Sequence, residues 1–160
     1  MASRRSNRIA GQFDARLIEM LESPAYRVAS LSCRMILDRI AIEHAHHGGK
    51  DNGKLPVTFD DFVDYGVHRQ AVSPALAEGE ALGLFFITEH GRAGIGDFRS
   101  SNKFRMAHRP VGNEEAGNEW NRIKTIKAAK AIAKTARAPW RRPAKRDKRH
   151  HRPSTMAAIS

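Results

Sequence analysis

The segment GVHRQAVSPALAEGEALG, residues 66–83, constrains the fold more than any other part of the chain. Its apolar residues are spaced as on one face of a helix, and a glycine at each end can close an element in the left-handed conformation. The preceding stretch TFDDFVDY is typical of a short helix, with Thr58 as N-cap and acidic residues in its first turn. The sequence therefore predicts two helices joined by a tight turn at Gly66.

Pro74 leaves the start of the second helix open. If this helix begins near His68, Pro74 lies beyond the first turn and costs about 3 kcal/mol. If Ser73 is instead the N-cap and Pro74 the first helical residue, the outward side of the helix becomes Ser73, Ala77 and Glu80. In either case we interpret Gly79 as a residue that allows close packing.

Local patterns also predict the elements around these two helices. Apolar residues at helical spacing indicate a first helix over 13–23 and another after Ser30 or Ser32. The stretch KLPVT is typical of a small strand that Pro56 confines to a sheet edge, while LFFITEH and KFRMAH predict a β-hairpin with a basic, glycine-rich tip. The predicted fold is mainly α with a small β-hairpin, an α+β class, and residues 13–110 have the element order of a winged helix-turn-helix.

Charge divides the chain into a neutral body and a basic end. The net charge is +11, and residues 118–152 hold 13 Lys and Arg against two acidic residues, which accounts for the whole excess. An alanine- and lysine-rich run predicts a basic amphipathic helix over 118–138. We expect a flexible arm over 1–12, a linker over 111–117 and a disordered basic tail over 139–160. A basic end on a neutral body is typical of a protein that meets a polyanion, most often nucleic acid.

Candidate DNA contacts come from three parts of the chain. The N-terminal residues of the second helix in a helix-turn-helix reach base edges in the major groove, where Arg suits guanine and Gln suits adenine. The hairpin tip offers donors for phosphates, and the lysines of the C-terminal helix follow phosphates or form the solvated side of a packed helix. The predicted DNA-binding residues are His68, Arg69, Gln70 and Ser73 in the helix, Arg92, Arg99, Ser101, Asn102 and Lys103 in the hairpin, and Lys124, Lys127, Lys130, Lys134, Arg141 and Arg142 in the C-terminal region.

Other functions are not indicated by the sequence. The stretch EHAHH groups His44, His46 and His47, but structural zinc needs about four ligands, usually with cysteine, and the single cysteine, Cys33, is distant. Histidines near the negative end of a helix are the better interpretation. We find no nucleophile motif and no phosphate-binding glycine loop, so we expect no enzyme, cofactor or metal. A lone cysteine and short apolar runs favour a cytoplasmic protein without a membrane partner.

The stretch HGGKDNGKLPVTFDDFVDYGVHRQAVSPALAEGEALG, followed by GRAG and NKFR, resembles small bacterial winged helix proteins related to plasmid and phage replication-initiator and regulator domains. The resemblance covers about Tyr26 to Arg109, and HGGKDNG with EALG is its most specific part. It implies a DNA-binding domain without catalytic residues. The sequence departs from that pattern at Gly79 and Phe86, where charged residues are expected.

The sequence therefore predicts a sequence-specific duplex DNA-binding protein. Its expected use is transcriptional regulation or replication control in a bacterium or mobile element. Two alternatives stay open: an RNA- or ribosome-associated basic protein, and a protein–protein adaptor that uses the tri-helical domain. A homodimer is compatible with the prediction, because symmetric half-sites favour a symmetric protein.

Overall fold

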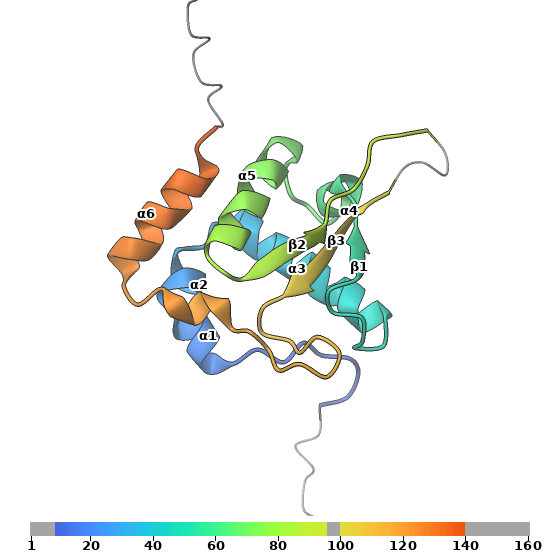
Figure 1. The fold of residues 1–160 in the computed structure, drawn as a ribbon, viewed down its shortest axis with the longest axis horizontal. Helices are drawn as coiled ribbons and strands as arrows, with labels where there is room; N and C mark the ends of the chain where they lie inside the picture. Colours follow the sequence, from blue (N-terminus) through green and yellow to red (C-terminus); the bar gives the residue numbers. More distant parts are fainter. Residues whose placement is uncertain (1–8, 96–99, 140–160) are drawn as a thin grey trace, which may run out of the picture.

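The computed structural model describes residues 9–95 and 100–139 (Figure 1). In order, these residues form α1 (Ile18–Glu22), α2 (Pro24–Val28), α3 (Leu31–His46), β1 (Leu55–Val57), α4 (Phe59–Asp64), α5 (Arg69–Ala81), β2 (Phe85–Glu89), β3 (Asn102–Met106), the short 3-10 helix η2 (Glu119–Arg122) and α6 (Ile126–Arg137). The three strands form one antiparallel sheet. The predicted α+β class is confirmed at this level.

The sheet has the order β1-β3-β2, so the last strand in the chain is the central one. Leu55 of β1 lies opposite Phe104 of β3, and Phe85 of β2 lies opposite Met106. The edge position of β1 explains why it tolerates Pro56, which has no N–H to donate. β2 and β3 form the predicted hairpin.

The core lies between α3, α5 and the sheet (Figure 1). On the central strand, the Phe104 ring stands edge-on to the rings of Phe62 and Phe85, with centroids 5.7 and 6.4 Å away. Ile36 and Leu37 of α3 are fully buried against the same cluster. Burial of these large side chains, each worth roughly 1.5–3 kcal/mol, holds the helices on the sheet.

Gly79 marks the closest approach of α5 to the sheet. A Cβ atom at this position would lie 2.0 Å from the Phe85 ring, so no other residue fits without displacing that buried ring. Glycine in the middle of a helix costs about 1 kcal/mol relative to alanine, and the contact with Phe85 explains why it is there. The predicted close packing is confirmed, and its partner is an aromatic ring of the sheet.

The start of α4 and the turn to α5 follow the predicted signals. The Thr58 hydroxyl accepts a hydrogen bond from the Asp61 N–H, and the Asp61 carboxylate accepts one from the Thr58 N–H. This reciprocal capping fixes where α4 begins. Gly66 has φ of 113°, which a residue with a side chain rarely adopts, and it reverses the chain before α5.

α5 runs unbroken from Arg69 to Ala81, with Pro74 inside it. The helix therefore starts near His68, and the alternative start at Ser73 is wrong. Val72 and Leu76, on either side of the proline, are both buried in the core. Their burial outweighs the hydrogen bond that Pro74 removes from the helix.

The predicted helix over 13–23 is wrong in extent. α1 begins only at Ile18, and Phe13 and Leu17, expected on its inner side, are 63% and 47% exposed. The sequence analysis also did not predict α2, where the Ser23 hydroxyl accepts a hydrogen bond from the Tyr26 N–H and Pro24 occupies the first turn. A serine followed by proline is a helix start, and here it ends α1 after five residues.

The predicted continuous helix over 118–138 is interrupted. Trp120 of η2 is buried against the core, and its indole N–H donates to Asn118 Oδ1. After this anchor the chain is extended, and Thr125 caps a new helix, α6. The expected linker over 111–117 makes an isolated bridge from Val111 to Glu114. Residues 1–8 of the expected arm and 140–160 of the expected tail lie outside the described residues.

Candidate nucleic-acid interface

The N-terminal end of α5 and its N-cap residue His68 carry the four residues of this segment predicted to contact DNA. His68, Arg69, Gln70 and Ser73 are all exposed, whereas Val72, Ala75 and Leu76 on the inner side are buried. The helical period that drives the inner residues into the core thus turns the polar residues outward. These residues are available to a ligand.

Arg69 is exposed, yet it has an ionic partner. Its guanidinium hydrogen-bonds to the Asp60 carboxylate on α4, with 62% and 57% of the two side chains exposed. An ion pair this exposed contributes less than about 1 kcal/mol, so a phosphate or base could displace Asp60. The pair nonetheless cancels the charge of the most prominent cation on the helix.

The hairpin uses several of its predicted ligands for its own structure. Arg92 and Ser100 pair through their backbones, and Asn102 Oδ1 accepts a hydrogen bond of 2.7 Å from the Gly91 N–H. Lys103 Nζ lies 2.8 Å from a carboxylate oxygen of Glu89 across the two strands. Ser101 is half-buried and the Arg92 side chain is exposed. Arg99, also predicted to contact DNA, lies outside the described residues.

Phe86, on β2, lies under a cation of the neighbouring strand. The Arg105 guanidinium sits 4.5 Å from the centre of the Phe86 ring and 2.7 Å from Glu119 Oε1. Stacking on the ring and pairing with the carboxylate hold Arg105 in place. The aromatic residue at this position, a departure from the expected family pattern, therefore supports an ordered contact between the sheet and η2.

A second cationic region lies between α2 and α6. We call it the α2–α6 groove, and its lining residues are Arg27, Val28, Ile126, Lys130, Ala133, Lys134 and Arg137. Ala133 is buried and forms part of the floor, while the lysines stand at the rim and are exposed. Four of the seven lining residues are basic and none is acidic. Lys130 and Lys134 are predicted from the sequence as DNA contacts, but Arg27 is not predicted as their neighbour.

The other predicted C-terminal ligands lie apart from this groove or outside the described residues. Lys127 is exposed on the same helix, while Lys124 precedes α6 and hydrogen-bonds to Asn121 Oδ1 over 3.0 Å. Arg141 and Arg142 are not described by the structure. The structure therefore brings together Lys130 and Lys134 of the predicted set.

A buried carboxylate anchors α6 to the body. Glu78 of α5 is fully buried and accepts hydrogen bonds from the Ser30 N–H at 2.9 Å, the Ser30 hydroxyl at 2.6 Å and Arg137 Nη1 at 2.8 Å. Through these bonds Glu78 of α5 joins the start of α3 to the end of α6. A buried charge needs such partners. The sequence offered one signal for this site, a glutamate on the apolar side of α5 next to Ala75 and Leu82.

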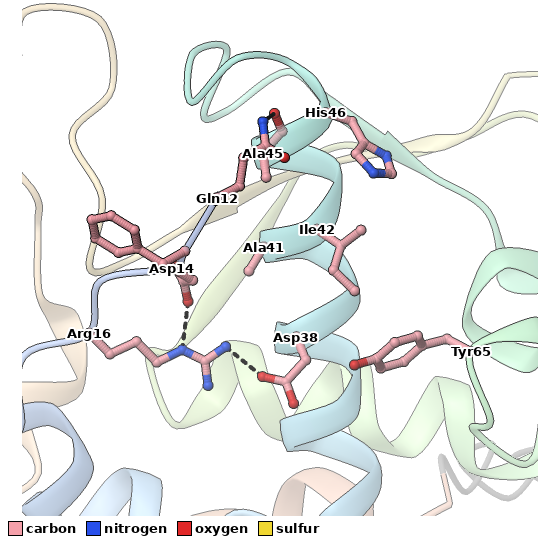
Figure 2. Close-up of a pocket in the computed structure, with 10 residues that line it drawn as sticks. Gln12, Asp14, Arg16, Asp38, Ala41, Ile42, Ala45, His46 and Tyr65 are labelled. Atoms are coloured by element: carbon pink, nitrogen blue, oxygen red, sulfur yellow. Dashed lines mark hydrogen bonds and ion pairs between the residues drawn. The ribbon is translucent and has the colours of Figure 1, made fainter. Parts of the chain in front are cut away.

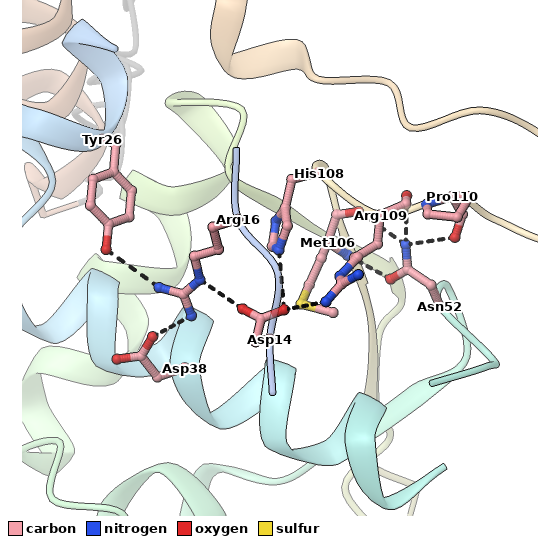
Figure 3. A network of polar contacts seen from close by, with 9 residues as sticks. All are labelled: Asp14, Arg16, Tyr26, Asp38, Asn52, Met106, His108, Arg109 and Pro110. Atoms are coloured by element: carbon pink, nitrogen blue, oxygen red, sulfur yellow. Dashed lines mark hydrogen bonds and ion pairs between the residues drawn. The ribbon is translucent and has the colours of Figure 1, made fainter. Parts of the chain in front are cut away.

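A second polar network holds the N-terminal segment on the body (Figure 3). The Asp14 carboxylate accepts hydrogen bonds from Arg16 Nε at 2.7 Å and from Arg109 Nη2 at 2.8 Å, and His108 Nε2 lies 3.6 Å away. Burial by itself raises the pKa of Asp14, but the contacts with His108, Arg109 and Arg16 outweigh burial and hold this pKa well below its usual range. Asp14 is therefore ionised and ties together elements distant in sequence.

Two histidines of EHAHH make contacts within the folded body. His44 is buried, and burial, followed by the charge of Arg109, lowers its pKa. His47 lies between two carboxylates, 3.3 Å from Glu43 and 3.2 Å from Asp51. Within residues 9–95 and 100–139, no three His, Cys, Asp or Glu side chains are grouped as a metal ion would require.

Figure 2 shows a hollow between the N-terminal segment and α3. Ala41, Ile42 and Ala45 of α3 form its floor, and Tyr65 stands at its far side from Gln12. Arg16 closes its lower end through a bond of 2.5 Å to Asp38. Arg16 pairs with both Asp14 and Asp38, and the hollow is mainly apolar.

The comparisons with known proteins add no relative. No family model matches the chain, and no match was found among the curated proteins or the solved structures. The resemblance to small bacterial winged helix proteins therefore stays a prediction. In the part of the chain that the structure describes, no helix combines the length and apolar character needed to cross a membrane.

Proposed function

We propose that this chain is a winged helix-turn-helix protein that binds duplex DNA. The observation that carries the proposal is the order α3, β1, α4, α5, β2, β3, with the sheet ordered β1-β3-β2 and the outer N-terminal end of α5 exposed. In this motif the helix after the turn enters the major groove and the following hairpin lies beside it. The role of α5 and the hairpin is then recognition, with no catalytic step.

In this proposal α5 supplies the base contacts. Arg69 would form two hydrogen bonds with guanine O6 and N7, and Gln70 would pair with adenine N6 and N7. Arg69 must exchange Asp60 for the base, which an exposed pair permits. His68 and Ser73 would contact phosphates or neighbouring bases, and Arg92 would reach the backbone from the hairpin.

The basic C-terminal region would add attraction that does not depend on sequence. Lys127 and Lys134 of α6 are exposed, and the chain beyond residue 139 adds seven Lys and Arg. Such cations release counterions from DNA, so their contribution falls steeply with salt. Control of transcription is the use that we favour, with control of replication on a mobile element as its variant.

The proposal is tested by selecting bound fragments from random duplex DNA and then measuring their affinity for variants. Arg69→Ala/Gln70→Ala should remove the preference for the selected fragment while weak general binding remains, a loss of roughly 1–3 kcal/mol per base-reading residue. The matched control, Arg122→Ala/Gln12→Ala, removes the same residue types from other exposed positions and should keep the preference. A preference that survives the α5 change would exclude α5 as the reading helix.

A further inference from the structure

Three of the four cations of the α2–α6 groove lack the acidic partners that Arg69, Lys103 and Arg105 have. Arg69, Lys103 and Arg105 each pair with a carboxylate. Among the described residues, Arg27, Lys130 and Lys134 form no ion pair, and the groove contains no acidic side chain. Only Arg137, at its end, is paired, with the buried Glu78. The groove therefore keeps a concentrated positive charge that a bound anion would neutralise.

The groove is also separate from the exposed end of α5. At 100° per residue, Lys130 and Lys134 lie on the side of α6 toward α2. The opposite flank of α6, with Ile132 and Ala136, faces Ala81 of α5 across a shallow apolar hollow. The groove lysines therefore lie on a different side of α6 from the residues that face Ala81 of α5.

Contacts from Arg34 hold the backbone of Arg27 in place. Arg34 Nη2 donates to the carbonyl oxygens of Tyr26 at 3.1 Å and Arg27 at 3.0 Å, and the Arg34 guanidinium lies 5.1 Å from the centre of the Tyr26 ring. These contacts fix the last turn of α2. The Arg27 side chain is exposed and projects from this fixed turn beside the lysines of α6.

We propose that the α2–α6 groove binds the sugar–phosphate backbone of nucleic acid as a site of its own. A row of cations from two elements suits regularly spaced phosphates, and an arginine can hold one phosphate with two hydrogen bonds. The apolar floor of Val28, Ile126 and Ala133 suits the sugar faces between phosphates. Lys130 and Lys134, one helical turn apart, repel each other in the free protein, and phosphates relieve this repulsion.

The test uses the full chain and a short fluorescent duplex of mixed sequence, with affinity measured by anisotropy from 50 to 200 mM salt. Arg27→Ala should weaken binding about 3- to 10-fold at low salt and reduce the slope of log affinity against log salt by about 0.9. Lys130→Ala/Lys134→Ala should reduce the slope by about twice as much. The charge-matched controls Lys54→Ala and Lys50→Ala/Lys54→Ala change exposed lysines between α3 and β1 and should have little effect. Circular dichroism confirms that each variant is folded.

Two results would overturn the proposal. If Arg27→Ala behaves as Lys54→Ala does, α6 contributes only diffuse charge and the groove is no site. If a polyglutamate peptide binds as tightly as the duplex and is weakened equally by the groove variants, the ligand is not a nucleic acid backbone. The proposal does not require that α5 reads bases. Groove variants should weaken all duplexes alike, whereas Arg69→Ala/Gln70→Ala tests sequence preference, so the two proposals fail separately.

Discussion

The exposed end of α5 with its hairpin and the α2–α6 groove both carry basic side chains. They differ in how many of these cations are paired with a carboxylate. On the first surface Arg69 and Lys103 each have a carboxylate within bonding distance, and of the described cations there only Arg92 has none. In the groove only Arg137 is paired, with Glu78, and Arg27, Lys130 and Lys134 have no carboxylate partner among the described residues. A paired cation binds a new anion only by giving up its partner, whereas an unpaired one gains the full attraction. We infer that the first surface suits selective contacts and the second suits general attraction.

The largest expected effect comes from shortening the chain. Removal of residues 139–160 takes away seven basic residues and one acidic residue. Affinity for every duplex should fall about 100-fold at 50 mM salt, and the salt dependence should become flatter. Titrations of the selected and mixed-sequence duplexes measure this. If only the selected duplex loses affinity, general attraction does not come from residues 139–160.

A change that loosens the attachment of α6 should affect binding in the α2–α6 groove and thereby distinguish it from binding at the exposed end of α5. Glu78→Gln replaces the charged acceptor of Ser30 and Arg137, so it should destabilise the fold by about 2 kcal/mol and weaken binding in the groove. Urea unfolding measures the first effect and anisotropy the second. Glu115→Gln, an exposed control, should change neither. An unchanged unfolding midpoint would contradict the anchoring role of Glu78.

Asp14 lies away from both surfaces. A substitution there should change stability without removing a proposed DNA contact. The lowered pKa of Asp14 means that its contribution to stability is fully present above the ordinary carboxyl pKa of about 4 and is lost progressively as pH falls from there through the lowered pKa of the folded protein. Asp14→Asn should therefore cost about 1.5 kcal/mol at pH 6 and much less at pH 2. Urea midpoints at the two pH values measure this. Equal losses at both values would show that the Asp14 charge is not the cause.

The smallest expected effect tests directly whether pairing with a carboxylate restrains Arg69. Asp60→Asn releases Arg69 from its carboxylate and removes one negative charge from the same surface. Affinity for duplex DNA should rise about 2- to 5-fold at low salt, in line with the strength of an exposed pair. Asp64→Asn, exposed at the end of α4 and without an ion pair among the described residues, serves as the charge-matched control. If both changes have the same effect, pairing does not restrain Arg69.

Local signals in the sequence predicted the middle of the fold well. Thr58 and Gly66 mark the ends of α4, and the alternating apolar residues of β3 predict which side of that strand faces the core. These features depend on residues a few positions apart. The predictions for α1 and α2 are wrong because they do not use the helix start at Ser23–Pro24.

The features that the sequence could not predict depend on contacts between distant residues. Gly79 is explained only by the Phe85 ring, and the break before α6 only by the burial of Trp120. The candidate site shows the same limit. The sequence predicts that Arg69 is exposed, but its pairing with Asp60 and the position of Arg27 beside α6 follow from the packing of helices.

The bonds of Glu78 to Ser30 and Arg137 have a consequence for where the chain leaves the folded body. Arg137 ends α6, so the point from which residues 140–160 depart is fixed relative to α5 and to the groove. If residues 140–160 bind a polyanion as we propose, that polyanion is held near both surfaces. Its binding to the second surface is then an intramolecular step at a raised effective concentration.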